Sequence, residues 1–89
     1  MTAKETELIK AIKEIPDCNE YGYKFESDLL VVIASVMGYK ISTEYRHRGI
    51  YRKIADPKEF EKAIKIRNGL KAHNIVKSSK TGTTFKVLV

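Results

Sequence analysis

The sequence has few of the residues from which small proteins build catalytic, metal or disulfide centres. It contains one cysteine, Cys18, and two histidines, His47 and His73. A single thiol excludes an internal disulfide and a cysteine-based zinc cluster, and it fits a reducing, cytoplasmic location. A glycine-rich phosphate loop and a His-Glu-His metal spacing are also absent. A Cys18 nucleophile with a histidine base is the remaining catalytic pairing, and an inert thiol is the commoner role, so we expect no enzyme, cofactor or metal.

Long hydrophobic runs are lacking as well. The longest spans residues 29–37 and contains Ser35, so it is too short to cross a membrane. Met1 is followed by Thr-Ala-Lys-Glu and not by an apolar leader segment. We therefore expect a soluble, intracellular protein that forms one domain over residues 1–89. A chain of this length has a modest core, and a homodimer would add buried area.

The charge is unevenly distributed along the chain. Residues 1–38 carry four Lys or Arg against seven Asp or Glu, whereas residues 39–89 carry thirteen against four. The net charges are therefore −3 and +9, which together give the overall +6. A positive C-terminal half suits a polyanionic partner. An ordinary solvated, lysine-rich surface is the alternative interpretation.

Helix signals are clearest in the last third of the chain. Asp56 suits an N-cap, Pro57 suits the first helical position, and Glu59 completes the spacing of a capping box. Asn74 tolerates the left-handed conformation that ends many helices, so we predict a helix over residues 57–73. Its apolar positions fall on or near one face: Phe60, Ala63, Ile64 and Leu70.

A β-hairpin is predicted after this helix. Residues 75–77 form a short β-branched run, residues 78–82 a polar turn with glycine, and residues 83–89 a second β-branched run. The run from Leu70 to Val76, followed by a basic tip from Lys77 to Gly82, resembles the winged helix-turn-helix superfamily, although many members have glycine where Asn74 stands. The resemblance implies a small α+β winged-helix domain with three helices and a C-terminal wing.

The first half of the chain has two further helix patterns. Thr2 and Glu5 have capping-box spacing, apolar residues follow at helical intervals as far as Ile15, and Pro16 ends the segment. Ser27-Asp28 suits the cap of a helix over residues 29–37 that Gly38 stops, although a buried strand fits this apolar run too. Between these segments, three aromatic residues alternate as a short strand or as core anchors: Tyr21, Tyr23 and Phe25.

Residues 39–55 alternate between apolar and polar residues and predict a second hairpin with a basic tip near His47-Arg48-Gly49. A helix over residues 42–55 is the alternative. Ala34 and Gly38 have the spacing of a helix-turn-helix unit, but Glu44 and His47 occupy positions where that motif has apolar residues.

The candidate DNA-binding residues come from the last helix, the wing and the second hairpin. Lysines and short hydroxyl side chains contact phosphates, whereas Arg and Asn also read base edges. The set is Lys58, Lys62, Lys65, Arg67, Asn68, Lys71, Lys77, Ser79, Lys80, Thr81, Arg46 and Arg48. For Arg67 and Asn68, surface salt bridges and helix-end solvation are the alternative roles.

These observations favour a DNA-binding protein, either a small transcriptional regulator or a plasmid or viral DNA-binding adaptor. Helix 57–73 would lie in the major groove of duplex DNA, the wing at 75–89 would hold phosphates, and a homodimer would match two half-sites. A protein-interaction module of the same architecture, docked on an acidic partner, is the main alternative. A small RNA-binding domain that stacks bases on Tyr45 and Tyr51 is another.

Overall fold

The fold is α+β, with three helices and two small antiparallel sheets within residues 3–89, which a computed structural model describes. Its elements, in chain order, are α1 (Ala3–Lys13), β1 (Lys24–Phe25), α2 (Glu26–Met37), β2 (Ile41–Arg46), β3 (Gly49–Ile54), α3 (Pro57–Ala72), β4 (Val76–Ser78) and β5 (Thr84–Val87). The predicted cap at Thr2 lies outside the described residues.

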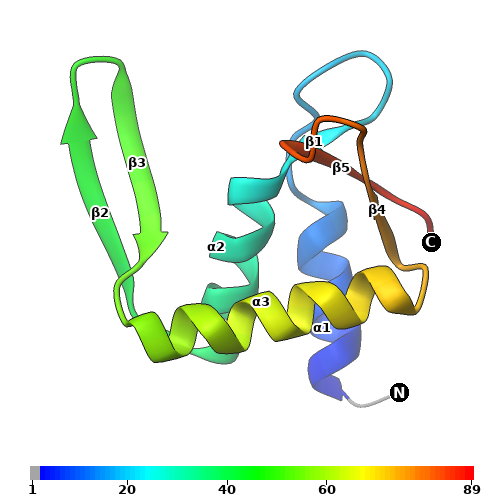
Figure 1. The fold of residues 1–89 in the computed structure, drawn as a ribbon, viewed down its shortest axis with the longest axis horizontal. Helices are drawn as coiled ribbons and strands as arrows, with labels where there is room; N and C mark the ends of the chain where they lie inside the picture. Colours follow the sequence, from blue (N-terminus) through cyan, green and yellow to red (C-terminus); the bar gives the residue numbers. More distant parts are fainter. Residues whose placement is uncertain (1–2) are drawn as a thin grey trace.

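Helix α3 runs along the base of the molecule (Figure 1). The β2–β3 hairpin rises at its N-terminal end, and the three-stranded sheet lies toward its C-terminal end. In that sheet β5 is central, in the order β1-β5-β4, with Phe25 opposite Thr84 and Ser78 opposite Phe85. The two hairpins therefore flank α3 at its opposite ends.

One hydrophobic core joins the three helices to the three-stranded sheet. Its largest fully buried side chains are Phe85, Ile12, Leu29, Ile33 and Val76. The predicted helix over residues 29–37 is confirmed, and the buried-strand alternative is wrong. From α3, Ala63 and Leu70 enter the core as predicted, whereas Phe60 is exposed.

The predicted ends of α3 are largely confirmed. Asp56 caps the helix by accepting a hydrogen bond from the Lys58 backbone N–H at 2.8 Å. The second half of the capping box is wrong, because Glu59 Oε1 accepts from the Lys40 backbone N–H at 3.1 Å. At the other end Asn74 is left-handed, with φ 57°, and Ile75 donates to the Leu70 carbonyl at 2.9 Å. This C-terminal bond belongs to a Schellman motif.

Helix α2 begins earlier than predicted, at Glu26, and Ser27-Asp28 does not cap it. Phe25 holds the N-cap position in an extended conformation without a side-chain cap bond. The Glu26 backbone N–H instead donates to the Thr83 carbonyl at 3.0 Å, so the wing satisfies a donor that a cap would otherwise take.

The short strand predicted around Tyr23 is confirmed as β1, but the core-anchor alternative is wrong for Tyr21 and Phe25, which are both exposed. The buried residue of β1 is Lys24. Its ammonium donates to the Ile15 carbonyl and pairs with Asp17 at 2.8 Å, which compensates the burial of the charge.

Residues 41–54 form the predicted hairpin, and the helix alternative is wrong. Ile41 pairs with Ile54 at the base and Arg46 with Gly49 at the tip, so His47 and Arg48 form the turn. Gly49 adopts φ 135°, which a residue with a side chain rarely reaches. Helices α2 and α3 are thus joined by a hairpin and not by the short turn of a helix-turn-helix.

Candidate nucleic-acid interface

A stripe of polar side chains faces solvent along α3. Residues in a helix advance by about 100° each, so Lys58, Lys62 and Lys65 fall on one side of the cylinder, opposite the buried Ala63 and Leu70. All three lysines are exposed, and Asn68 lies at the margin of the same side. None of the three ammonium groups pairs with an acidic residue of the described chain. We call Lys58, Lys62, Lys65 and Asn68 the α3 stripe.

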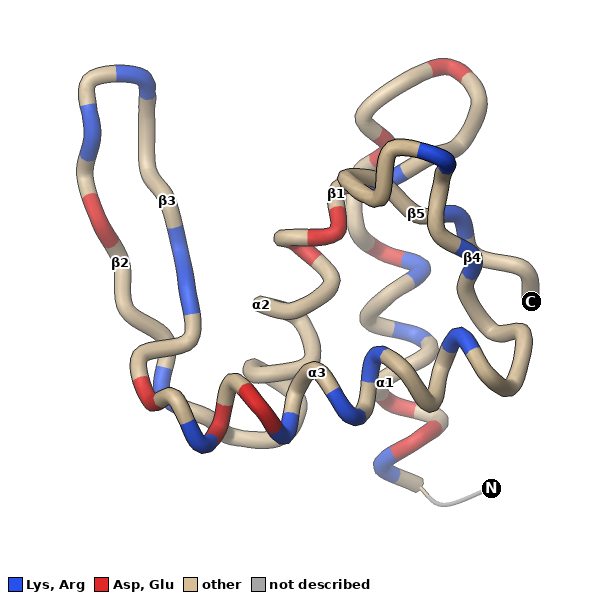
Figure 2. Tube along the Cα trace, in the orientation of Figure 1, with Lys and Arg blue, Asp and Glu red and all other residues tan. Residues whose placement is uncertain are grey.

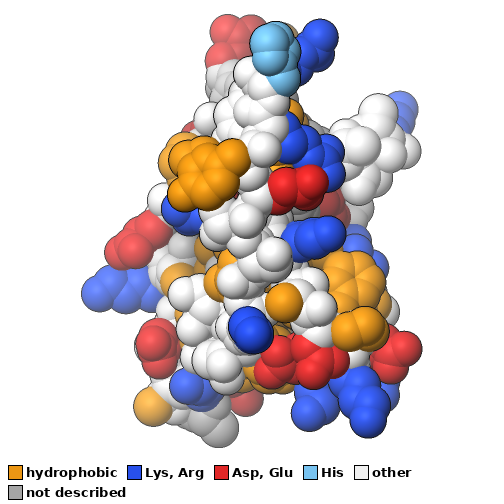
Figure 3. Space-filling view, turned by 90° about the vertical axis from the view of Figure 1, so that its left-hand side faces the viewer, with side chains coloured by type: hydrophobic (Ala, Val, Ile, Leu, Met, Phe, Trp, Pro, Cys, Tyr) orange, Lys and Arg blue, Asp and Glu red, His pale blue; other side chains and the backbone are white. Residues whose placement is uncertain are grey.

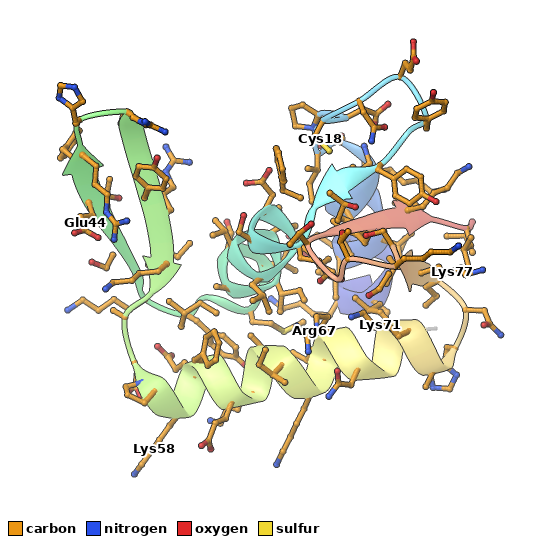
Figure 4. The ribbon with its side chains drawn as sticks, turned by 45° about the horizontal axis from the view of Figure 1, so that its top comes forward. Cys18, Glu44, Lys58, Arg67, Lys71 and Lys77 are labelled. Carbon is orange, nitrogen blue, oxygen red and sulfur yellow. The ribbon has the colours of Figure 1, made fainter. Side chains whose placement is uncertain are left out.

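Lys71, in the last turn of α3, points toward α2 and the sheet instead (Figure 4). Its ammonium lies 3.2 Å from Glu26 Oε1, which also accepts a hydrogen bond from the Ser78 hydroxyl at 2.8 Å. Glu26 is only 8% exposed. This three-residue contact joins α2, α3 and β4, so Lys71 serves the packing of these elements in addition to any surface role.

Arg67 is one helical turn before Lys71 and is half-buried. Its Nε is buried without a hydrogen-bond partner among residues 3–89, and so is Glu26 Oε2. One guanidinium nitrogen, Nη2, donates to Asn68 Oδ1 at 3.3 Å. The structure therefore places Arg67 beside the α3 stripe and not on it, and Asn68 is the better placed of the two predicted base-reading residues.

The wing presents lysines on an organised turn. Lys77, Lys80 and Thr81 are exposed, and Ser79 is half-buried. Three hydroxyl contacts order the turn: Ser79 to Thr81 at 3.0 Å, Thr81 to Thr83 at 2.9 Å, and Thr84 to Ser79 at 2.8 Å. Because each hydroxyl has one proton, these contacts use most of the donors that we expected to face phosphate. The wing would bind an anion mainly through its lysines and backbone N–H groups.

Lys86 belongs to the wing surface but was not among the predicted site residues. It lies directly opposite Lys77 in the β4–β5 register, and both side chains are exposed. Like charges at such a pair are unfavourable unless an anion lies nearby. Lys86 also lies 5.9 Å from the ring centre of Tyr23. Only the strand register reveals this pair, so sequence reasoning had no signal for it.

The tip of the β2–β3 hairpin carries the two predicted arginines in different environments. Arg46 donates to Glu44 Oε2 at 2.9 Å and lies 4.9 Å from the ring centre of Tyr51. This hydrogen bond and the charge of Arg46 hold the pKa of Glu44 below its usual value. Arg48 has no ion-pair partner in the described chain. Arg46 is partly neutralised, whereas Arg48 offers its full charge to solvent.

The basic residues are divided among three surfaces: the hairpin, α3 and the wing (Figure 2). Most acidic residues lie in α1, in the loop before β1 and at the start of α2. Within residues 3–89, no group of three His, Cys, Asp or Glu side chains is placed to hold a metal ion. Cys18, His47 and His73 lie in three separate segments: the loop before β1, the hairpin turn and the end of α3.

Comparisons with known protein families, with curated proteins and with solved structures found no match for this chain. Across residues 3–89, every helix is too short or too polar to pass through a bilayer. The geometry and charge of the three basic surfaces are therefore the features that bear on function.

Lys71→Met tests the structural role of the Glu26 contact. The substitution leaves a buried carboxylate with Ser78 as its remaining partner, so we expect a loss of about 1–3 kcal/mol in unfolding free energy. Urea denaturation followed by circular dichroism measures it. Lys65→Met, on the exposed side of the same helix, is the control and should cost less than about 0.5 kcal/mol. Equal losses in both variants would contradict the assignment.

Proposed function

We propose that this chain is a winged-helix DNA-binding protein that inserts the α3 stripe into the major groove and holds flanking phosphates with the wing. The observation that carries the proposal is the α3 stripe itself. Three unpaired lysines and an asparagine of the described chain face solvent from one rigid helix, while the opposite side of that helix is fixed in the core. An α-helix fits the major groove, where asparagine can pair with adenine edges.

The connections around α3 support the winged-helix assignment. The helix turns through Asn74 into β4, the chain returns as β5, and β5 also pairs with β1, which leads into α2. The wing tip therefore lies beside the start of α2, and α3 is held against both. The β2–β3 hairpin between α2 and α3 departs from the short turn of the motif, but it leaves the exposed side of α3 free.

In this proposal the protein acts as a small transcriptional regulator or as a plasmid or viral DNA-binding adaptor. A two-fold dimer would place two α3 helices on half-sites separated by about 34–36 Å, one turn of the duplex. The same basic surfaces would also suit an acidic protein partner or RNA. The salt dependence and the strand preference of binding distinguish these classes of partner.

The wing provides the test. Lys77→Ala combined with Lys80→Ala should weaken binding to all duplexes about equally, because lysines on phosphates carry no sequence information. The slope of log affinity against log salt should fall in magnitude by roughly 0.9 for each phosphate that is no longer neutralised. Fluorescence anisotropy with labelled duplexes at several salt concentrations measures both quantities.

The matched control is Lys10→Ala combined with Lys13→Ala, which removes the same charge from the exposed side of α1. It should leave the slope nearly unchanged. Absence of duplex binding by the unmodified protein, together with binding to an acidic protein or to single-stranded RNA, would overturn the proposed function.

A further inference from the structure

The tip of the β2–β3 hairpin exposes an apolar pair that the fold itself does not use. Tyr45 and Ile50 lie directly opposite each other in the register, one pair before the turn. Tyr45 is 79% exposed and Ile50 is 58% exposed. Figure 3, which looks onto this side of the molecule, shows hydrophobic side chains at the surface close to the histidine at the tip.

The strand alternation explains why the pair is bare. Tyr45 and Ile50 share one side of the hairpin with Ile41 and Ile54, and at the base of the hairpin Ile54 is buried in the core. Toward the tip the same side leaves the protein and has nothing to pack on (Figure 1). Two strands of six residues reach about 20 Å, so the apolar pair stands well away from the core.

Basic side chains surround this apolar pair. Residues 39–55 hold five Lys or Arg, which are Lys40, Arg46, Arg48, Arg52 and Lys53, and one acidic residue, Glu44. Docking two copies of the chain through their tips would bring these like charges together, which disfavours a second copy as the partner. A polyanion with apolar surface between its charges fits better, and stacked base pairs flanked by phosphates have this character.

We infer that the β2–β3 hairpin is a second DNA-contacting arm, in which Tyr45 and Ile50 form an apolar wedge that enters between base pairs and bends the duplex. The inference rests on the proposed function and adds deformation of the DNA to it. The hairpin rises beside the N-terminal end of α3, so with α3 in the major groove it reaches the adjacent minor groove. Wedges of this kind unstack a base step and bend the duplex by about 20–90°.

The tip arginines complete the arm. Arg48, in the turn, has no ion-pair partner among residues 3–89 and can contact a phosphate beside the wedge. Arg46 is held by Glu44 and by the ring of Tyr51, on the other side of the hairpin from Tyr45. Glu44 opposes DNA binding in two ways, because it occupies Arg46 and would itself lie near phosphate.

The wedge is tested with Tyr45→Thr combined with Ile50→Thr. Threonine keeps a high strand propensity, so the hairpin is retained while the apolar surface is removed. Energy transfer between dyes on the two ends of a duplex reports the bend. The unmodified protein should bend the duplex, and the variant should bind it nearly straight while keeping the same salt slope, because no charge has been removed.

Glu44→Gln gives an independent result from the same surface. Releasing Arg46 should strengthen duplex binding and increase the magnitude of the salt slope by roughly 0.9, as expected when one more phosphate is neutralised. An unchanged slope would count against the hairpin as a DNA arm.

Two outcomes separate this inference from the proposed function. Duplex binding that depends on Lys77 and Lys80, with no bend and no effect of the Tyr45 and Ile50 substitutions, overturns the wedge alone. Absence of duplex binding overturns both. Loss of single-stranded RNA binding on substitution of Tyr45 and Ile50, with duplex geometry unaffected, would also reject the wedge and assign the hairpin to base stacking.

Discussion

Phe85→Ala is expected to lower the free energy of unfolding by about 3–5 kcal/mol. The Phe85 side chain is 0% exposed and belongs to β5, the central strand between β1 and β4. Its removal leaves a cavity where the sheet meets the three helices, so the loss of burial and the loss of packing add together. Urea denaturation monitored by circular dichroism measures the change.

Phe60→Ala is the matched control, because it removes the same atoms from a phenylalanine that is 44% exposed on α3. Its cost should stay below about 1.5 kcal/mol, as part of its apolar surface is already in water. Domains of this size have only about 5–15 kcal/mol of stability, so Phe85→Leu provides a milder variant if Phe85→Ala fails to fold. A larger cost for Phe60→Ala than for Phe85→Ala would show that the core is wrongly placed.

The features that sequence reasoning placed correctly are those set by neighbouring residues. Asp56 and Asn74 mark the two ends of α3 because their side chain and backbone preferences act within one turn of the helix. The β2–β3 hairpin follows in the same way from apolar–polar alternation around Gly49. Local chemistry was sufficient at these positions, and the α+β class followed from them.

Features set by distant residues were missed or misplaced. Helix α2 begins at Glu26 because its first N–H bonds to Thr83, a residue that is remote in sequence. Glu59 fails to complete the capping box because the Lys40 N–H competes for its carboxylate. Glu26 similarly draws Lys71 away from the exposed side of α3. Residue type and helical position alone could not separate Lys71 from the lysines of the α3 stripe.

Lys58→Ala, Lys62→Ala and Lys65→Ala together should produce the largest loss of DNA affinity. If each lysine displaces about 0.9 counterions, leaving three phosphates without a lysine reduces the salt slope by about 2.7 and the affinity near 0.1 M salt by roughly 10²–10³-fold. The helix itself should remain folded, because alanine has the highest helix propensity and all three positions are exposed. Anisotropy titrations of a labelled duplex at several salt concentrations give both values.

The control for this variant carries Lys4→Ala, Lys10→Ala and Lys13→Ala, which lower the net charge by the same amount on exposed positions of α1. A general loss of positive charge would weaken binding similarly in both triple variants, whereas insertion of the α3 stripe into the groove requires a much larger loss for the α3 variant. Equal losses would mean that α3 does not enter DNA. Unchanged duplex affinity in the α3 variant, with loss of binding to an acidic protein, would instead identify the stripe as a protein-docking surface.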